Sequence, residues 1–447
     1  MNRGENRQIS SQRLRLWSAI GYAGLLLAAP FYGGRMLTSG KNRAGLRQRL
    51  TLYSAEERRR FSQGPYLWIH AVSVGELMAA RPLLQRLKRD YPDRKIFVTT
   101  VTPTGQELAQ KTPEVDESLY FPLDLYPLSR RLLSLVRPQC LIILETEIWP
   151  NAIRAAAEDG IPLFMVNARL SDRSYKNYLR ARWLFEPVLS LFSAILAQSD
   201  VDAERFRSLH APPGVVSAAG NLKFEAAAEM DPAERAQWRQ RFGIRDDEIV
   251  WLGGSTFPGE EAALACVFSA LCKEGFPLRL LIAPRHVERA AEIERELKEM
   301  GFSLIRRSQI GDSYSPSDPA PIILLDTIGE LRRVYSAADI VFMGKSLCGK
   351  GGQNPLEPAA WGRPIFYGEN MQNFRDVSAL LLRAGAARCV KNEGELIEAG
   401  RALCESPQQR EEMGRRAQEI VRSNRGALQR IMETLAPALD RAAGRSR

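Results

Sequence analysis

The sequence has few residues of the kinds that hold metal ions or build disulfide frameworks. Its 447 residues include three scattered His and six Cys, which form no CxxC pair and no zinc-ligand spacing. These absences argue against a zinc-binding or disulfide-rich protein and favour reduced, buried thiols in a cytoplasmic one. The sequence also lacks internal repeats and low-complexity tracts, and its apolar content of 45% is that of an ordinary globular protein.

Net positive charge is scarce beyond the first sixty residues. The net charge is +10, but residues 1–60 hold twelve Lys and Arg against three acidic residues, so the remaining chain is nearly neutral. A nucleic-acid-binding protein more often spreads a basic stripe over its fold, so we expect no nucleic-acid partner. A basic region beside an apolar segment fits an anionic membrane surface better.

The apolar segment in this basic region is residues 16–34, which carry no charge. At about 1.5 Å per residue, a helix of this length just crosses a hydrocarbon core of about 30 Å. We interpret it as a single membrane anchor, with a cleaved signal peptide and a buried helix as the alternatives. More basic residues follow the segment than precede it, so the positive-inside rule places the body of the protein in the cytoplasm, at the inner (plasma) membrane.

The rest of the chain is too long for one ordinary core. Short apolar runs alternate with amphipathic stretches of helical length, which predicts parallel sheets covered by helices on both faces. A polar, charged stretch at 225–247 interrupts the alternation, so we expect two doubly wound α/β domains. The expected parts are a basic tail and anchor helix at 1–40, a first domain at 41–228, a second domain at 229–425 and a C-terminal helix at 426–447.

Eleven apolar runs are predicted to be strands. They are Tyr66–Val72, Lys95–Val101, Cys140–Glu145, Pro162–Asn167, Ala194–Gln198 and Val215–Ala219 in the first domain, and Ile249–Gly253, Leu278–Ala283, Pro321–Leu325, Asp339–Met343 and Pro364–Tyr367 in the second. Sheets of this kind bind ligands outside the carboxyl ends of their strands. Two of them facing each other would form a cleft suited to a reaction between two substrates.

The first predicted strand leads into a helix that begins near Val74, with Ser73 and Glu76 in the spacing of a capping box. A carboxylate near a helix N-terminus has its pKa lowered by the helix dipole, whereas a general base that works near neutral pH needs a raised pKa. Burial could offset the dipole. On spacing alone, Glu76 is therefore either a helix cap or a catalytic base.

Other strand ends in the first domain carry polar side chains. Glu145 and Glu147, two positions apart, follow one strand and precede Trp149. Arg169 follows the next strand, where it could meet an anionic group of a substrate. Asp200 starts a helix and is expected to be its N-cap.

The second domain has its most informative element at 350–358, KGGQNPLEP. Asn354 is expected to be a helix N-cap and Pro355 the first helical residue. A glycine pair before a helix N-terminus could cradle an anion, and Glu357 could accept hydrogen bonds from ribose hydroxyls. A tight turn followed by a capped helix explains the same residues.

Ten motifs in consistent order resemble the lipid A Kdo transferase family, whose members transfer 3-deoxy-D-manno-octulosonic acid (Kdo) from CMP-Kdo to a lipid A precursor. They are HAVSVGE at 70–76, TTVTPTG at 99–105, ETEIWPN at 145–151, NARLSDRS at 167–174, GNLKFE at 220–225, GGST with GEE at 253–261, APRH at 283–286, IGEL at 328–331, GGQNPLEPAA at 351–360 and NFRD at 373–376.

The resemblance implies a GT-B fold, with two facing Rossmann-like domains, and an inverting transfer that uses no metal and no cofactor beyond the donor substrate. It implies that Glu76 is the general base and that the acceptor is the lipid A precursor (lipid IVA) at the cytoplasmic face of the inner membrane. The CMP contacts that it implies are Pro284, Arg285, Ile328, Gly329, Glu330, Asn354, Pro355, Leu356 and Glu357. The motif Asp200-Val201-Asp202 matches the DxD of metal-dependent sugar transferases, but a monophosphate leaving group can be stabilised by a basic side chain and helix N-termini.

The sequence departs from the family pattern at two positions, where Phe257 and Gln353 replace histidines. Gln353 can still form hydrogen bonds, but neither replacement can titrate, so the resemblance does not carry a role of those histidines in acid catalysis or carboxylate binding over to these positions. The alternatives are another GT-B nucleotide-sugar transferase and a non-catalytic, membrane-attached nucleotide-binding protein. No motif sets the number of Kdo residues added.

Overall fold

The computed structural model describes residues 45–226, 231, 233–311, 314–317 and 320–442. The apolar segment at 16–34 lies outside these residues, so the membrane anchor stays a prediction. Within the described ranges, no helix combines the length and the apolar character needed to cross a membrane.

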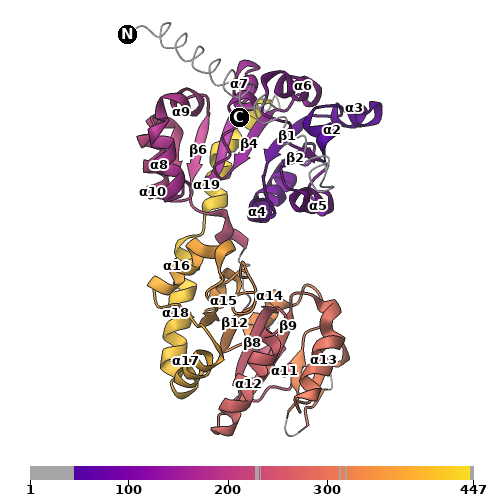
Figure 1. The fold of residues 1–447 in the computed structure, drawn as a ribbon, viewed down its shortest axis with the longest axis vertical. Coiled ribbons are helices and arrows are strands. Elements are labelled where there is room, and N and C mark those ends of the chain that lie inside the picture. The colour runs from indigo at the N-terminus through magenta and orange to yellow at the C-terminus, as the bar shows by residue number, and fades with distance from the viewer. Residues whose placement is uncertain (1–44, 227–230, 232, 312–313, 318–319, 443–447) are drawn as a thin grey trace, which may run out of the picture. The chain divides into compact units, whose positions relative to one another are not determined.

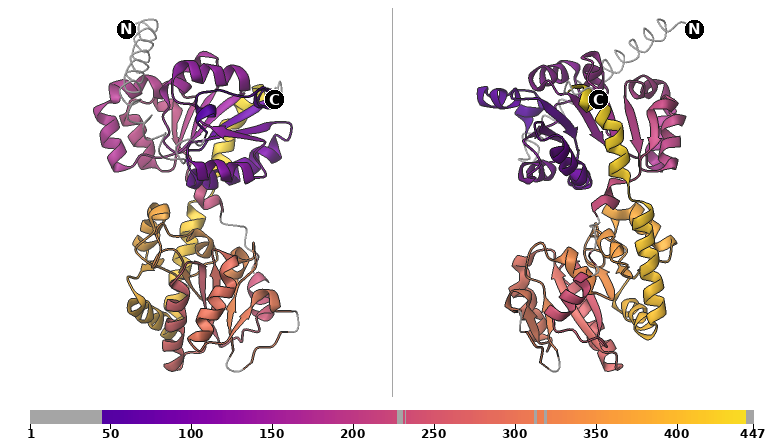
Figure 2. Two further views of the ribbon diagram at one scale, coloured as in Figure 1. Left: turned by 45° about the vertical axis from the view of Figure 1, so that its right-hand side comes forward. Right: turned by 180° about the vertical axis from the view of Figure 1, so that it is seen from behind.

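The chain divides into two compact units, each with its own sheet and covering helices in Figures 1 and 2. The first unit runs to Glu225 and resumes at Arg425, and the second unit is Ala226–Asn424. The first unit therefore includes the last helix of the chain.

The first unit contains a parallel sheet of seven strands in the order β3-β2-β1-β4-β5-β6-β7. The strands are β1 (Tyr66–His70), β2 (Lys95–Thr100), β3 (Glu117–Tyr120), β4 (Cys140–Leu144), β5 (Leu163–Ala168), β6 (Ala194–Ala197) and β7 (Val216–Ala218). Its helices are α2 (Leu46–Arg49), α3 (Ala55–Phe61), α4 (Val74–Asp90), α5 (Pro103–Lys111), α6 (Tyr126–Val136), α7 (Pro150–Glu158), α8 (Asp172–Arg180), α9 (Arg182–Leu189), α10 (Asp200–Ser208) and α19 (Ala427–Ala442). From β1 the chain first adds β2 and β3 on one side of the sheet and then β4 to β7 on the other side, so the order reverses between β1 and β4. Sheets of this kind bind ligands at this reversal point, outside the carboxyl ends of the strands.

Both faces of the first sheet are buried under helices. Along β1, Trp68 belongs to one apolar cluster, whereas Leu67 and Ile69 belong to the cluster on the other face. This alternation follows from the two-residue period of a strand. Helix α19 contributes Ile431 and Leu435 to the second cluster, so the end of the chain completes the core of the first unit.

The second unit repeats this architecture, with the strand order β10-β11-β9-β8-β12-β13-β14. The strands are β8 (Ile249–Thr256), β9 (Leu278–Pro284), β10 (Leu304–Arg306), β11 (Ile322–Leu324), β12 (Ile340–Met343), β13 (Ile365–Tyr367) and β14 (Ala387–Cys389). Its helices are α11 (Ala233–Arg241), α12 (Glu260–Lys273), α13 (Ala290–Glu299), α14 (Leu331–Val334), α15 (Leu356–Ala360), α16 (Arg375–Arg383), α17 (Glu393–Glu405) and α18 (Pro407–Ser423). Here the reversal lies between β8 and β12.

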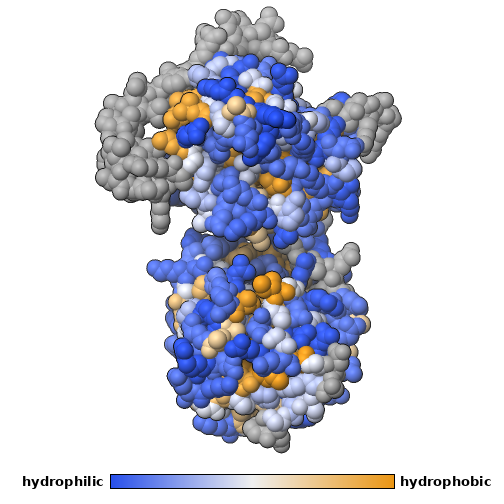
Figure 3. Space-filling view, turned by 90° about the vertical axis from the view of Figure 1, so that its right-hand side faces the viewer, coloured by the Kyte–Doolittle hydropathy of each residue, from blue (hydrophilic) through white to orange (hydrophobic). Residues whose placement is uncertain are grey.

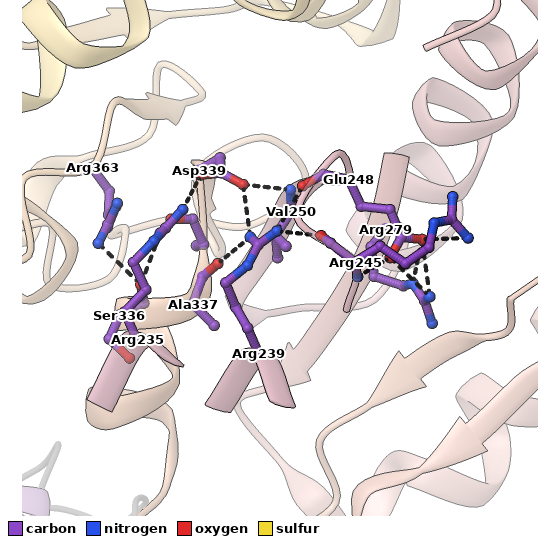
Figure 4. A network of polar contacts seen from close by, with 11 residues as sticks. Arg235, Arg239, Arg245, Glu248, Val250, Arg279, Ser336, Ala337, Asp339 and Arg363 are labelled. Carbon is purple, nitrogen blue, oxygen red and sulfur yellow. Dashed lines mark hydrogen bonds and ion pairs between the residues drawn. The ribbon is translucent and has the colours of Figure 1, made fainter. Parts of the chain in front are cut away.

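A polar network fixes the amino ends of the central strands of the second sheet (Figure 4). Asp339, just before β12, accepts the backbone N–H of Val250 in β8 at 2.8 Å and pairs with Arg235 and Arg239 of α11. Arg279 of β9 is 1% exposed, and its Nη2 lies 2.9 Å from Glu248 Oε1, just before β8. The network therefore aligns β8, β9 and β12, whose opposite ends carry the predicted donor-binding residues.

All eleven predicted strands are confirmed, but three further strands were missed. β3, β10 and β14 each have three or four residues and lie at outer edges of their sheets. Edge strands bury less surface and tolerate charged residues, so they lack the apolar run that identifies a central strand.

The surface seen in Figure 3 is mostly hydrophilic, and its hydrophobic residues form small separate groups. Scattered apolar residues of this kind are normal on a folded domain. One exposed residue matters for the site, because Ile328 belongs to the predicted CMP contacts and is 86% exposed.

Candidate functional site

Glu76 lies at the N-terminus of α4, directly after β1 and thus at the reversal point of the first sheet. Its side chain is buried, with 8% of its surface exposed. Oε2 accepts the backbone N–H of Val72 at 2.7 Å, and Oε1 accepts the hydroxyl of Ser73 at 3.0 Å. The carboxylate is therefore held by the loop that leaves β1.

This arrangement is not the capping box that the spacing suggested. Ser73 is the N-cap residue of α4, but its side chain accepts no hydrogen bond from the helix. A complete box of the same Ser-x-x-Glu spacing occurs at α3, where Ser54 Oγ accepts the N–H of Glu57 at 3.1 Å and Glu57 Oε2 accepts the N–H of Ser54 at 2.7 Å. Ser54 and Glu57 thus form a complete box, whereas at Ser73 and Glu76 the hydroxyl donates to the carboxylate.

Burial raises the pKa of Glu76 to about 7. The hydrogen bonds from Val72 and Ser73 lower this pKa, and the negative charges of Glu145 and Glu147 raise it. Desolvation disfavours the charged form of a carboxyl group, and here it outweighs the effects that favour ionisation. The sequence left open which effect would win.

Two more carboxylates follow β4, the neighbour of β1 in the sheet. Glu145 has a positive φ of 55°, a strained backbone conformation for a residue other than glycine. Arg169 Nε donates to Glu145 at 2.9 Å, and Lys223 Nζ lies 3.9 Å from the same carboxylate. Arg169, predicted as an anion-binding residue, therefore pairs with Glu145. Burial and then the charge of Glu145 raise the pKa of Glu147.

The rings of His70, Phe121 and Trp149 pack together. His70 and Trp149 belong to the sequence segments that carry Glu76 and Glu147. His70, the last residue of β1, is fully buried, with its ring centroid 4.2 Å from Phe121 and 6.0 Å from Trp149. Burial lowers the pKa of His70 to about 3, so its imidazole is neutral at physiological pH. Sequence reasoning did not find this aromatic cluster, because no local pattern links these positions.

Asp124 fixes the segment that carries Trp149. Its carboxylate accepts the backbone N–H groups of Asn151 at 3.1 Å and Ala152 at 2.9 Å, in the first turn of α7. Burial raises the pKa of Asp124 to about 6. It too was missed, because it caps a helix from 27 residues away in the sequence.

In the second unit, the predicted CMP contacts Arg285 and Glu357 lie close enough for their charges to interact. Pro284 ends β9, and the backbone N–H of Arg285 donates to Thr256 O at 3.0 Å, which ties β9 to the end of β8. Burial raises the pKa of Glu357, while the charges of Arg332 and Arg285 lower it. Arg285 itself is exposed at the carboxyl edge of the sheet.

The loop before α15 differs in one detail from the prediction. The helix begins at Leu356 with Pro355 as its N-cap, so Asn354 lies one position outside the cap. Asn354 Oδ1 nevertheless accepts the N–H of Leu356 at 3.1 Å, which is the hydrogen bond of an Asx turn just before the helix. Gly352 has a positive φ of 70°, and a Cβ there would lie 2.4 Å from the sulfur of Met371, so the position requires glycine.

The predicted contacts at 328–330 lie before α14. Gly329 has a positive φ of 88°, and Glu330 precedes the first helical residue. Glu330 accepts hydrogen bonds from Arg307 and from Thr327. Its carboxylate is therefore engaged, whereas the exposed Ile328 is free to contact a ligand.

Phe257, which replaces a histidine of the family pattern, lies between two basic side chains. Its ring centroid is 5.6 Å from that of His286, and the ammonium of Lys345 lies 5.0 Å from the Phe257 ring centre. These residues follow β8, β9 and β12, at the reversal point of the second sheet. Sequence reasoning did not single out Lys345.

The prediction that Asp200 caps α10 is wrong by one residue. Ser199 is the N-cap, and its hydroxyl oxygen accepts the N–H of Asp202 at 3.1 Å. Asp202 in turn accepts the N–H of Leu170 at 3.0 Å. The second aspartate of the DxD match thus connects α10 to the end of β5.

Comparisons with known proteins agree with the sequence motifs. A family described as 3-deoxy-D-manno-octulosonic-acid transferase (kdotransferase) matches residues 44–226. The 3-deoxy-D-manno-octulosonic acid transferase of Haemophilus influenzae is 36% identical over 385 residues, which cover 84% of this chain and 87% of the relative. The corresponding protein of Bordetella pertussis is 31% identical over 83% of this chain and 86% of its own length.

Among solved structures, UDP-GlcNAc 2-epimerase from Neisseria meningitidis matches with a TM-score of 0.52 and 16% identity, over 83% of this chain and 99% of that one. This likeness concerns the fold alone and supports two parallel-sheet α/β domains resembling those of GT-B glycosyltransferases. On the identity and coverage of its relatives, the chain belongs to the 3-deoxy-D-manno-octulosonic acid transferases, a family of glycosyltransferases.

Proposed function

We propose that the protein transfers Kdo from CMP-Kdo to the lipid A precursor lipid IVA, by a metal-independent, inverting displacement with Glu76 as the general base. The observation that carries this proposal is the buried carboxyl group of Glu76, whose pKa of about 7 suits a base at neutral pH. Its place at the reversal point of the first sheet, where parallel α/β sheets bind ligands, supports the same role.

In the proposed reaction, Glu76 removes the proton of an acceptor sugar hydroxyl. The hydroxyl oxygen forms a bond to the anomeric carbon of Kdo, on the face opposite the phosphate. The bond between that carbon and the phosphate oxygen breaks, and CMP leaves with the electron pair. The configuration at the anomeric carbon is therefore inverted.

The second unit would hold the donor. Arg285 is an exposed cation at the carboxyl edge of the sheet and would pair with the phosphate as CMP leaves. Glu357 would accept hydrogen bonds from ribose hydroxyls, with Arg285 and Arg332 favouring its ionised form. Pro284, Ile328, Gly329, Glu330 and the turn at 354–356 would complete the nucleotide contacts.

We further propose that the enzyme works at the cytoplasmic face of the inner membrane, held by its N-terminal segment. The basis is the uncharged segment at 16–34 and the excess of basic residues around it. The lipid acceptor would then lie in the same membrane as the anchor.

The test compares wild type with Glu76→Ala, using purified full-length protein, CMP-Kdo and lipid IVA, with the lipid product analysed by mass spectrometry. We expect wild type to add Kdo, and the variant to stay folded and bind CMP in a thermal shift assay yet lose turnover. Retained activity together with a stability loss of about 1 kcal/mol would instead assign Glu76 a capping role only.

A further inference from the structure

Glu260 is a fully buried carboxylate that binds backbone rather than side chains. It is the first residue of α12, the helix after β8, and has no exposed surface. Its carboxylate accepts the N–H groups of Phe257 at 2.9 Å, Lys345 at 2.7 Å, Ser346 at 2.9 Å and Leu347 at 3.0 Å. One carboxylate thus ties the loop after β8 to the loop after β12.

The loop held in this way has an unusual conformation at Lys345. Its φ is +58°, in the left-handed region that favours glycine and asparagine and disfavours a long side chain. The Lys345 carbonyl accepts the N–H of Gly352 at 3.0 Å, so the same residue also fixes the glycine pair before Asn354. A lysine kept in a strained conformation by surrounding contacts points to a functional constraint on its side chain.

The Lys345 side chain turns toward the strand ends. Its ammonium lies 5.0 Å from the Phe257 ring centre, a cation–π contact that fixes the position of the charge without neutralising it. Among the residues that the structure describes, no carboxylate forms an ion pair with this ammonium. Glu260, which binds the backbone N–H of Lys345, uses its oxygens for backbone N–H groups.

This charge lies where a ligand of the second sheet is expected. Phe257 follows β8 and Lys345 follows β12, the two strands between which strand addition reverses. Arg285 follows β9 on the other side of β8 and is bonded through its backbone to Thr256. A donor bound across these three strand ends would therefore meet two cations.

We infer that Lys345 is a further donor-binding residue, which contacts an anionic group of the sugar nucleotide, and that Glu260 is the positioning residue that holds it there. The inference rests on the proposed function, because CMP-Kdo supplies the anions, a phosphate and the carboxylate of the sugar acid. Lys345 binds one of these two groups, and Arg285 binds the phosphate.

The test measures steady-state kinetics with varied CMP-Kdo, and calorimetric binding of CMP alone, for wild type and Lys345→Met. Methionine keeps the length of the side chain and removes the charge. We expect the donor KM to rise about tenfold or more, as for the loss of a charge-assisted contact, while kcat stays within about threefold. Lys273→Met, which removes an exposed charge at the far end of α12, is the matched control and should match wild type.

The calorimetric binding of CMP identifies which anionic group of the donor Lys345 contacts. A weaker affinity for CMP as well assigns Lys345 to the phosphate, and an unchanged affinity for CMP with a raised donor KM assigns it to the sugar carboxylate. An unchanged donor KM in Lys345→Met overturns the inference. A wild type that neither binds CMP nor uses CMP-Kdo contradicts the proposed function instead.

Glu260→Gln tests the positioning role of Glu260. The substitution places an amide NH₂ group, which is a donor, against backbone N–H groups that the wild-type carboxylate accepts. We expect a raised donor KM in the folded fraction, beyond any loss of stability. The matched control is Glu261→Gln, since Glu261 is equally buried but accepts from Thr256 and Arg289, and among the described residues it forms no hydrogen bond to the loop after β12. A donor KM equal to that of wild type in Glu260→Gln would reduce Glu260 to a stabilising residue.

Discussion

The two units carry a buried glutamate at corresponding places, and the two residues have different surroundings. Glu76 and Glu260 each lie at the start of the helix that follows the first strand of their sheet. Glu76 accepts one backbone N–H and one hydroxyl, whereas Glu260 accepts four backbone N–H groups within 3.0 Å. A carboxylate with that many fixed donors has its acceptor sites occupied by the backbone, so Glu260 organises a loop.

The comparison shows that position in the fold does not set the role of such a glutamate. What differs is the number of fixed donors aimed at the carboxylate and the charges around it. Glu76 has two donors and two acidic neighbours, Glu145 and Glu147, and its pKa is raised to about 7. Glu260 has four fixed backbone donors, the N–H groups of Phe257, Lys345, Ser346 and Leu347.

The largest expected effect concerns turnover. Glu76→Gln keeps the size of the side chain and removes the basic carboxylate, so kcat should fall by about 10²–10⁴-fold, the usual contribution of a general base. CMP affinity, measured by calorimetry, should stay at the wild-type value. If Glu76→Gln kept more than a tenth of the wild-type kcat, Glu76 would not be the base and would be a structural residue, as Glu260 is.

The second prediction concerns stability. Glu260→Ala leaves four backbone N–H groups buried without an acceptor, each at a cost of about 1 kcal/mol or more, so the free energy of unfolding should fall by at least about 3 kcal/mol. Glu76→Ala should lose about 1 kcal/mol or less. Urea unfolding followed by circular dichroism compares the two, and equal losses would remove the structural distinction between them.

The third prediction concerns pH. The folded pKa of Glu76 is raised, so the carboxyl group is protonated below about pH 7 and gains its basic form as the pH rises. With donor and acceptor at low concentration, the rate should rise about tenfold per pH unit below 7 and level off above it. Glu147→Gln removes a negative neighbour and should move this inflection to lower pH. An inflection unaffected by Glu147→Gln would mean that another group controls the rate.

The smallest expected effect compares the two Ser-x-x-Glu sequences. Ser54→Ala breaks a complete capping box and should cost about 1 kcal/mol in thermal or urea unfolding. Ser73→Ala removes no cap bond from α4, so its cost should be about half of that or less. Because the Ser73 hydroxyl lowers the pKa of Glu76, its loss should move the pH inflection upward. Equal costs for the two variants would indicate that Ser73 caps α4 after all.

The central strands could be predicted from the sequence because each is an apolar run flanked by turns and helices. Of the four edge strands only β7 was predicted; β3, β10 and β14 were not, since pairing on one side alone leaves them short and partly exposed. Glu76 and Glu357 could be identified from their motifs, but spacing could not separate the capping role of Glu76 from the catalytic one, because that depends on burial.

The residues that sequence reasoning missed act over long sequence separations. Glu260 lies 85 positions before the Lys345 N–H that it accepts, and Asp124 lies 27 positions before Asn151. No local pattern encodes such pairs.

Helix α19 has a consequence for how the chain is made. It is synthesised after the whole second unit, yet Ile431, Leu435 and Leu439 belong to the same buried cluster as Leu67 and Ile69 of the first strand. The first unit therefore cannot close its core during synthesis until the whole second unit has been translated. While the second unit is being made, one apolar face of the first sheet lacks part of its cover, and the nascent chain would be a natural client for chaperones at that stage.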